Sequence, residues 1–249
     1  MNHPSKFLRQ RGLSIVEFMV GVAVGLLIVG GATKLFADYV ITNKRMLLET
    51  RVNQDLRAAA EIVARDVRRA GYWNDALTGL WGAGSASVAT NPHLNGLGAL
   101  SPTTGTTNFV NYTYARTSGG TGGLDSNEYA GFRLQSVNGV GTLQMQDGQA
   151  SWQAITDPGT VRMTGFTVTP AAGALTNDLS RYCGCLARLT CTMANIADPT
   201  FNPAGVPTLS IASFDIVLTG QAVNDPAVTR TVSETVRVRN PRLTGACPP

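Results

Sequence analysis

The chain has 249 residues, of which 43% are hydrophobic and 14% are charged, and its formal net charge is +4. Three basic residues (Lys6, Arg9 and Arg11) lie in residues 1–12 without any acid, so four minus three leaves +1 for residues 13–249. Residues 71–249 contain nine Arg, no Lys and ten acids, and this balance argues against general nucleic-acid binding, which needs a basic surface.

An apolar stretch with one acid follows the basic leader. No formally charged residue occurs from Phe18 to Thr33, and counted from Leu13 the stretch has about the 20 residues that span a bilayer. Glu17 lies inside it, and a carboxylate within a membrane segment usually has a functional partner. A plain signal anchor would explain the apolar run alone. A cleaved signal peptide would need a small-residue site, for which residues 30–33 are a poor candidate.

The run from Gly12 to Glu17 resembles the class III signal of type IV prepilins and pseudopilins. The resemblance implies that a prepilin peptidase cuts between Gly12 and Leu13 and methylates the new amino terminus. It also implies that Glu17, the fifth residue of the mature chain, directs assembly. The family usually has Phe at the first mature position, where this chain has Leu13.

Residues 34–70 predict that the helix continues beyond the apolar stretch, because they are rich in helix formers and contain no Pro or Gly. An apolar stripe recurs at steps of three and four residues, formed by Leu56, Ala59, Val63, Val67 and Ala70. Glu61 and Arg65 form a favourable pair one turn apart on another face. Gly71 is the residue expected just after the helix end.

Residues 64–73, which read A-R-D-V-R-R-A-G-Y-W, resemble the close of the long helix in minor pilins of the PilW type. They resemble more loosely the J-type minor pseudopilin of type II secretion. Residues 235–240 resemble the final strand of both kinds of protein. The resemblance implies an α+β, type IV pilin-like fold, in which a long N-terminal helix packs on an antiparallel β-sheet head.

Alternation of apolar and polar residues predicts several strands in the head. The predicted strands are residues 109–114, 128–134, 142–146, 151–155 and 161–168, followed by a hairpin of residues 210–218 and 229–239. Turns are predicted at residues 119–123, which are rich in Gly, and at residues 146–149, which contain Asp147-Gly148. Residues 74–106 and 171–206 are predicted to be irregular.

Four cysteines lie in the head: Cys183, Cys185, Cys191 and Cys247. An even number in an oxidising compartment indicates two disulfides, and cysteines two residues apart rarely bond each other. We expect either Cys183 or Cys185 to pair with Cys191 and the other to pair with Cys247. Zinc or redox chemistry is the alternative interpretation, although the C-x-C spacing is unusual for either.

The sequence offers little catalytic chemistry. His93 is the only histidine after residue 12, so neither a catalytic triad nor a His-based metal site can be assembled. Half of the ten acids of the head stand near Gly, Asn or Pro and are interpreted as turn residues: Asp147, Asp157, Asp178, Asp198 and Asp225. Trp73, Trp81 and Trp152 are expected to pack in the core or at the helix end. We expect no catalytic residue, metal, cofactor or small-molecule substrate.

These observations predict four segments: a leader (residues 1–12), a transmembrane helix (13–33), its amphipathic continuation (34–70) and a periplasmic head (71–249). The resemblance implies a minor pilin that helps to prime a type IV pilus for surface attachment and twitching motility. The implied partners are the prepilin peptidase, other minor pilins, the major pilin and a tip adhesin. The chain would lie in the inner membrane before assembly and in the pilus afterwards. The alternatives are a J-type pseudopilin and a DNA- or receptor-binding tip module.

Overall fold

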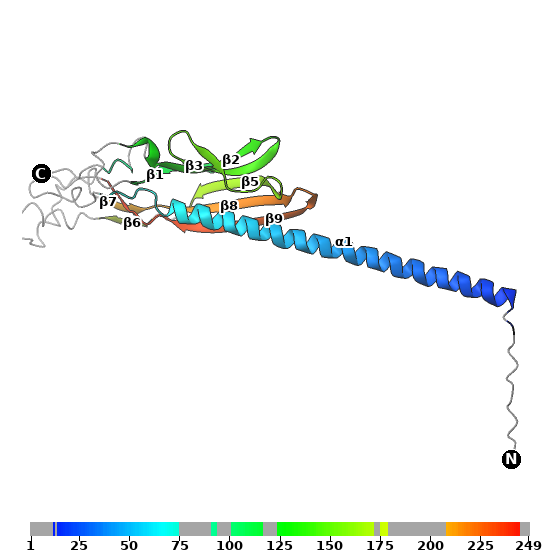
Figure 1. The fold of residues 1–249 in the computed structure, drawn as a ribbon. Coiled ribbons are helices and arrows are strands. Elements are labelled where there is room, and N and C mark those ends of the chain that lie inside the picture. Colours follow the sequence, from blue (N-terminus) through cyan, green and yellow to red (C-terminus); the bar gives the residue numbers. More distant parts are fainter. Residues whose placement is uncertain are drawn as a thin grey trace, which may run out of the picture. The chain divides into compact units, whose positions relative to one another are not determined.

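The computed structural model describes residues 12, 14–74, 91–93, 101–116, 124–171, 175–178 and 208–244. They form the expected α+β fold, in which one long helix is combined with antiparallel sheets (Figure 1). The helix α1 covers Ile15–Val67. The chain divides between Leu47 and Leu48 into two compact units, so α1 contributes to both.

Within the described residues, the head contains three antiparallel sheets. The first has the order β1-β2-β3-β4, formed by Phe109–Thr113, Tyr129–Val137, Val140–Asp147 and Trp152–Ala154. The second has the order β5-β8-β9, formed by Val161–Pro170, Ser213–Ala222 and Asp225–Arg237. The third has the order β10-β7-β6, formed by Arg242–Thr244, Thr208–Ile211 and Leu175–Asp178. A short 3₁₀ helix, Ser126–Glu128, precedes β2.

The second half of α1 packs on the β5-β8-β9 sheet through the predicted apolar stripe. The buried residues of α1 are Val52, Leu56, Ala59, Ala60, Val63, Ala64 and Val67. Burying each Leu or Val side chain stabilises the fold by about 1.5–3 kcal/mol. Polar contacts fix the position of this part of the helix, since Glu49 pairs with Arg230 of β9 and Asp55 accepts a 3.4 Å hydrogen bond from Thr160. The predicted Glu61–Arg65 pair is confirmed at 2.7 Å.

The β2–β3 hairpin turns at Asn138 and Gly139, whose φ angles are 50° and 79°. Two positive φ angles are typical of the tight turn whose twist matches the flanking strands, and Asn-Gly is the pair that adopts it most readily. The inward face of the sheet buries Val110, Phe132 and Leu143. This face meets the β5 strand and completes the core.

The five predicted strands and the final hairpin are confirmed, with boundaries that differ by up to four residues. The predicted hairpin strand at residues 210–218 is in fact split between β7 and β8. The expectation that residues 171–206 are irregular is wrong for residues 175–178, which form β6. Strands this short do not show a clear alternation of apolar and polar residues in the sequence. Their pairing with distant segments decides that they form strands.

Candidate functional site

The amino-terminal part of α1 holds the residues predicted to direct processing and assembly. The helix begins at Ile15, and the N–H of Phe18 donates to the carbonyl oxygen of Ser14 at 3.1 Å. Glu17 lies in the first helical turn and is exposed, where the positive end of the helix dipole favours a carboxylate. Gly12 is exposed, and Leu13 lies outside the described residues.

Beyond Glu17, α1 presents an uncovered apolar surface. Large side chains at positions 15–47 are exposed, among them Phe18 at 67%, Leu27 at 77% and Leu35 at 73%. Within the described residues, α1 is the one helix long and apolar enough to cross a membrane, and none of that stretch is buried inside the chain. Such a surface fits a bilayer or a neighbouring helix, because either removes the apolar side chains from water.

At its other end α1 stops at Val67, three residues before the predicted end at Ala70. The N–H groups of Arg69 and Ala70 each reach back only three residues, at 2.9 Å and 3.0 Å, so the last turn is tightened. The N–H of Gly71, whose φ is 71°, donates instead to the carbonyl oxygen of Thr113 in β1 at 2.9 Å. The helix thus ends by joining the four-stranded sheet.

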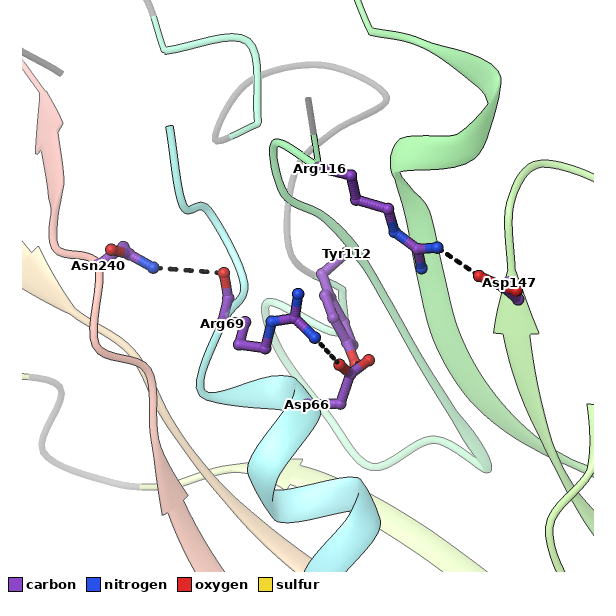
Figure 2. Close-up of polar contacts among 6 residues, drawn as sticks. All are labelled: Asp66, Arg69, Tyr112, Arg116, Asp147 and Asn240. Atoms are coloured by element: carbon purple, nitrogen blue, oxygen red, sulfur yellow. Dashed lines mark hydrogen bonds and ion pairs between the residues drawn. The ribbon is translucent and has the colours of Figure 1, made fainter. Parts of the chain in front are cut away.

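Side-chain amides from distant segments satisfy the carbonyl groups of this turn. Asn240 Nδ2 donates to the carbonyl oxygens of Arg69 and Ala70 at 3.3 Å and 3.0 Å, the first of which is drawn in Figure 2. Asn91 Nδ2 donates to the carbonyl oxygen of Gly71 at 3.0 Å. Because unpaired carbonyl groups at a helix end are costly when buried, these amides hold the helix end in one position within the head.

A buried tyrosine ties the same helix end to β1. The hydroxyl group of Tyr112 donates to Asp66 Oδ2 at 2.6 Å, and Arg69 contacts Asp66 Oδ1 at 3.2 Å (Figure 2). Burial raises the pKa of Tyr112 well above its usual value, and the Asp66 carboxylate raises it further. The phenol is therefore a permanent hydrogen-bond donor, which suits a structural contact and not acid–base chemistry near neutral pH.

Two guanidinium groups flank the next tyrosine. The guanidinium carbons of Arg69 and Arg116 lie 4.2 Å and 5.1 Å from the ring centroid of Tyr114. Arg116 also pairs with Asp147 at the end of β3 (Figure 2). Each arginine is neutralised by a carboxylate, so this cluster offers no free charge to a ligand and serves to join α1, β1 and β3.

His93 is buried beside β1, and this was not apparent from the sequence, where it stands in a turn-like context. Its Nδ1 lies 3.1 Å from Thr113 Oγ1. Glu128, also buried, accepts a 2.9 Å hydrogen bond from the N–H of Asp125. Burial lowers the pKa of His93 below its ordinary value of 6.5, and the Glu128 carboxylate offsets this only in part.

This lowered pKa predicts an acid-sensitive contribution to stability. Between the folded-state pKa of His93 and 6.5, the unfolded chain binds more protons than the folded chain. The free energy of unfolding is therefore highest above pH 6.5 and falls as the pH drops through this window. Urea unfolding at pH 8.0 and 5.5 measures the difference, and His93→Gln should reduce it. If the wild-type protein and His93→Gln lose the same stability between pH 8.0 and pH 5.5, groups other than His93 cause the acid sensitivity.

The structure places the remaining candidate residues as follows. All four cysteines lie outside the described residues, so their pairing stays a prediction. Asp157 Oδ1 accepts a hydrogen bond from the N–H of Gly159 at 2.8 Å, which confirms it as a turn residue. The same interpretation is wrong for Asp178, which ends β6, and for Asp225, which begins β9 and accepts a hydrogen bond from the N–H of Ala227 at 3.2 Å. Trp152 is half-buried under Arg133 and is not a core residue. The described residues contain no group of three or more acidic, His or Cys side chains that could hold a metal ion.

Comparison with known proteins matches the chain to a protein family. The family described as PpdB, prepilin peptidase-dependent protein B, matches residues 45–238. That range begins within α1 and extends past the end of β9, and it leaves out the Gly12–Glu17 motif. No curated protein and no solved structure matches the chain.

Proposed function

This chain belongs to the family of prepilin peptidase-dependent protein B, and on that basis we propose that it is a minor pilin of the PilW type that primes a type IV pilus and enters it. The family ties the chain to pilus or pseudopilus systems. The PilW assignment is supported by residues 64–73, which close the helix at the point where it joins the sheet.

The observation that carries the proposal is the position of the processing motif. Gly12 and Glu17 stand at the beginning of an exposed apolar helix, and the same helix continues into the head that the family match covers. Because the match starts at residue 45, the motif and the match support the proposal independently. Neither feature depends on a catalytic centre, and we propose a role in assembly and not in catalysis.

The proposal predicts a mature chain that begins at N-methylated Leu13. Mass spectrometry of the N-terminal peptide, from cells with and without the prepilin peptidase, measures this directly. Cleavage should require the peptidase, and Gly12→Val should leave the chain at full length. A chain that starts at Met1 in peptidase-containing cells, or after a cut beyond Gly31, would contradict the assignment.

The proposed partners are the prepilin peptidase, other minor pilins, the major pilin and a tip adhesin. The apolar part of α1 would anchor the chain in the inner membrane, with the head in the periplasm, until the subunit enters the pilus. The J-type pseudopilin of type II secretion remains the second candidate, because the family match fits both systems. Co-purification with pilins or with pseudopilins separates the two.

A DNA- or receptor-binding tip is the candidate from another class. Nine Arg and ten acids in residues 71–249 do not supply the excess of positive charge that non-specific DNA binding needs. Several of the described arginines of the head are neutralised by acids of the head or of α1, as in the Arg116–Asp147 and Arg230–Glu49 pairs. DNA binding is therefore not part of the proposal.

A further inference from the structure

The outward face of the four-stranded sheet carries a group of side chains that the proposed assembly role does not use. Val110, Tyr112 and Phe132 point inward, so their neighbours along the strands point outward. Two outward rows cross the sheet in register. These rows, which we name the amide face, are Asn111, Gly131, Gln146 and Trp152, and beside them Phe109, Arg133, Gln144 and Ala154. The face contains no acid.

Two amide oxygens converge over Gly131. A Cβ atom added there would lie 2.7 Å from Asn111 Oδ1 and 3.2 Å from Gln146 Oε1. Gln146 is only 9% exposed, and its Nε2 donates to the carbonyl oxygen of Gln149 at 3.2 Å, which sets the orientation of Oε1. Among the described residues, no donor reaches Oε1. A buried acceptor without a donor is costly, so the pair of oxygens suits a ligand that brings hydroxyl groups.

The neighbouring row holds a fixed positive charge. The guanidinium carbon of Arg133 lies 3.9 Å from the ring centroid of Trp152, and its Nε donates to Gln144 Oε1 at 3.0 Å. Arg133 has no carboxylate partner within the part of the chain that the structure describes. Stacking and the Nε contact orient the planar group and leave its two terminal nitrogens for a bidentate contact with a carboxylate.

We propose that the amide face binds an acidic saccharide, a chain that contains uronic acid units. The Arg133 guanidinium lies over Trp152, and Trp152 pairs with Gln146 in the same row as Gly131, so the carboxylate-binding and hydroxyl-binding groups belong to neighbouring positions of the face. In the proposed complex, the carboxylate of one sugar unit contacts Arg133 and its hydroxyl groups donate to Asn111 and Gln146. The rings of Phe109 and Trp152 offer apolar edges to the C–H faces of adjoining units.

The geometry favours a saccharide over other anionic polymers. A nucleic acid needs several cations along its backbone, and Arg133 is the one charged residue of the two rows. An acidic peptide presents N–H groups about 6.7 Å apart on one side of an extended strand. The two oxygens near Gly131 both lie close to a single Cβ position, which matches adjacent hydroxyl groups of one ring better than spaced peptide groups.

Isothermal titration calorimetry on the full chain in detergent tests the proposal, with trigalacturonate as the probe and maltotriose as the neutral control of equal length. Trigalacturonate should bind at least about tenfold more tightly than maltotriose, because a hydrogen-bonded charge pair contributes that much. Arg133→Gln should abolish this preference, and Asn111→Ala should weaken the binding of both sugars. Arg162→Gln, which removes an exposed arginine of β5, is the matched control and should change neither.

Several outcomes would overturn the inference: no binding of trigalacturonate at millimolar concentration, equal affinity for maltotriose, or an unchanged preference in Arg133→Gln. Tighter Arg133-dependent binding of a hexaglutamate peptide or a single-stranded oligonucleotide would also overturn it, in favour of that ligand. Thermal unfolding of each variant checks that the head is intact. The measurement does not involve pilus assembly, so its failure leaves the proposed function untouched, and the reverse also holds.

Discussion

Replacing Glu17 by Val is expected to leave membrane insertion and cleavage intact and to remove the subunit from the proposed minor-pilin complex. Insertion should persist because Val is more apolar than Glu, and cleavage because Gly12 is unchanged. Assembly should fail because Glu17 is exposed in the first turn of an apolar helix, where it needs a partner of opposite charge. Under the proposed function, the amine of a neighbouring subunit's Leu13, created by cleavage, would supply that charge in a medium of low dielectric constant.

The test is to express Glu17→Val, verify its membrane fraction and processed size, and measure co-purification of the other minor pilins together with piliation. Glu61→Val is the matched control, since Glu61 lies on the same helix and makes an exposed pair with Arg65 that contributes little. We expect the control to assemble normally. Normal assembly of Glu17→Val would show that Glu17 makes no assembly contact in this protein.

Replacing Gly141 by Ala is expected to destabilise the head more than the same replacement at any other described glycine of the sheets. The new Cβ would lie 2.0 Å from the backbone carbonyl oxygen of Met163 in β5. No side-chain rotation can relieve a clash with backbone, so β3 and β5 would have to move apart. Overpacking at a rigid contact costs about 3 kcal/mol or more. Urea unfolding of the full chain in detergent, followed by tryptophan fluorescence, measures this cost.

Gly139→Ala is the matched control in the same hairpin. Its Cβ would meet nothing within 4 Å, but its φ of 79° is unfavourable for Ala, so a cost of about 1 kcal/mol is expected. The two variants together separate a packing clash from backbone strain. If Gly141→Ala is no less stable than Gly139→Ala, the close approach of β3 and β5 does not limit stability.

The parts of the fold that were predicted correctly are those with a repeating pattern along the chain. The stripe from Leu56 to Ala70 is buried as expected, because helical spacing alone decides which side chains share a face. The strands β1, β2, β3 and β5 alternate clearly enough to be found within a few residues. The Asn138-Gly139 turn was not identified, although that dipeptide is a strong signal for a hairpin.

Contacts between distant residues account for what the sequence did not reveal. Tyr112 is 46 residues from Asp66 and Asn240 is 170 from Ala70, and no local pattern links them. The early end of α1 follows from such contacts, because groups from other segments take over the hydrogen bonds of its last turn. In the candidate site, Gly12 and Glu17 were recognisable as a short contiguous motif, whereas Arg133 and Trp152 meet only because β2, β3 and β4 are in register.

The way the head holds the last turn of α1 has a mechanical consequence. A pull along the helix from its amino-terminal side reaches contacts spread over about 20 residues, from the Glu49–Arg230 pair to the Asn240 amide. The polar contacts of Asp66 and Arg68 bear this load together, in shear, along with the buried stripe. Contacts loaded in parallel must break at the same moment, which requires far more force than opening them one after another. If the chain enters a pilus as proposed, this fastening of the head to its helix would suit a fibre under tension.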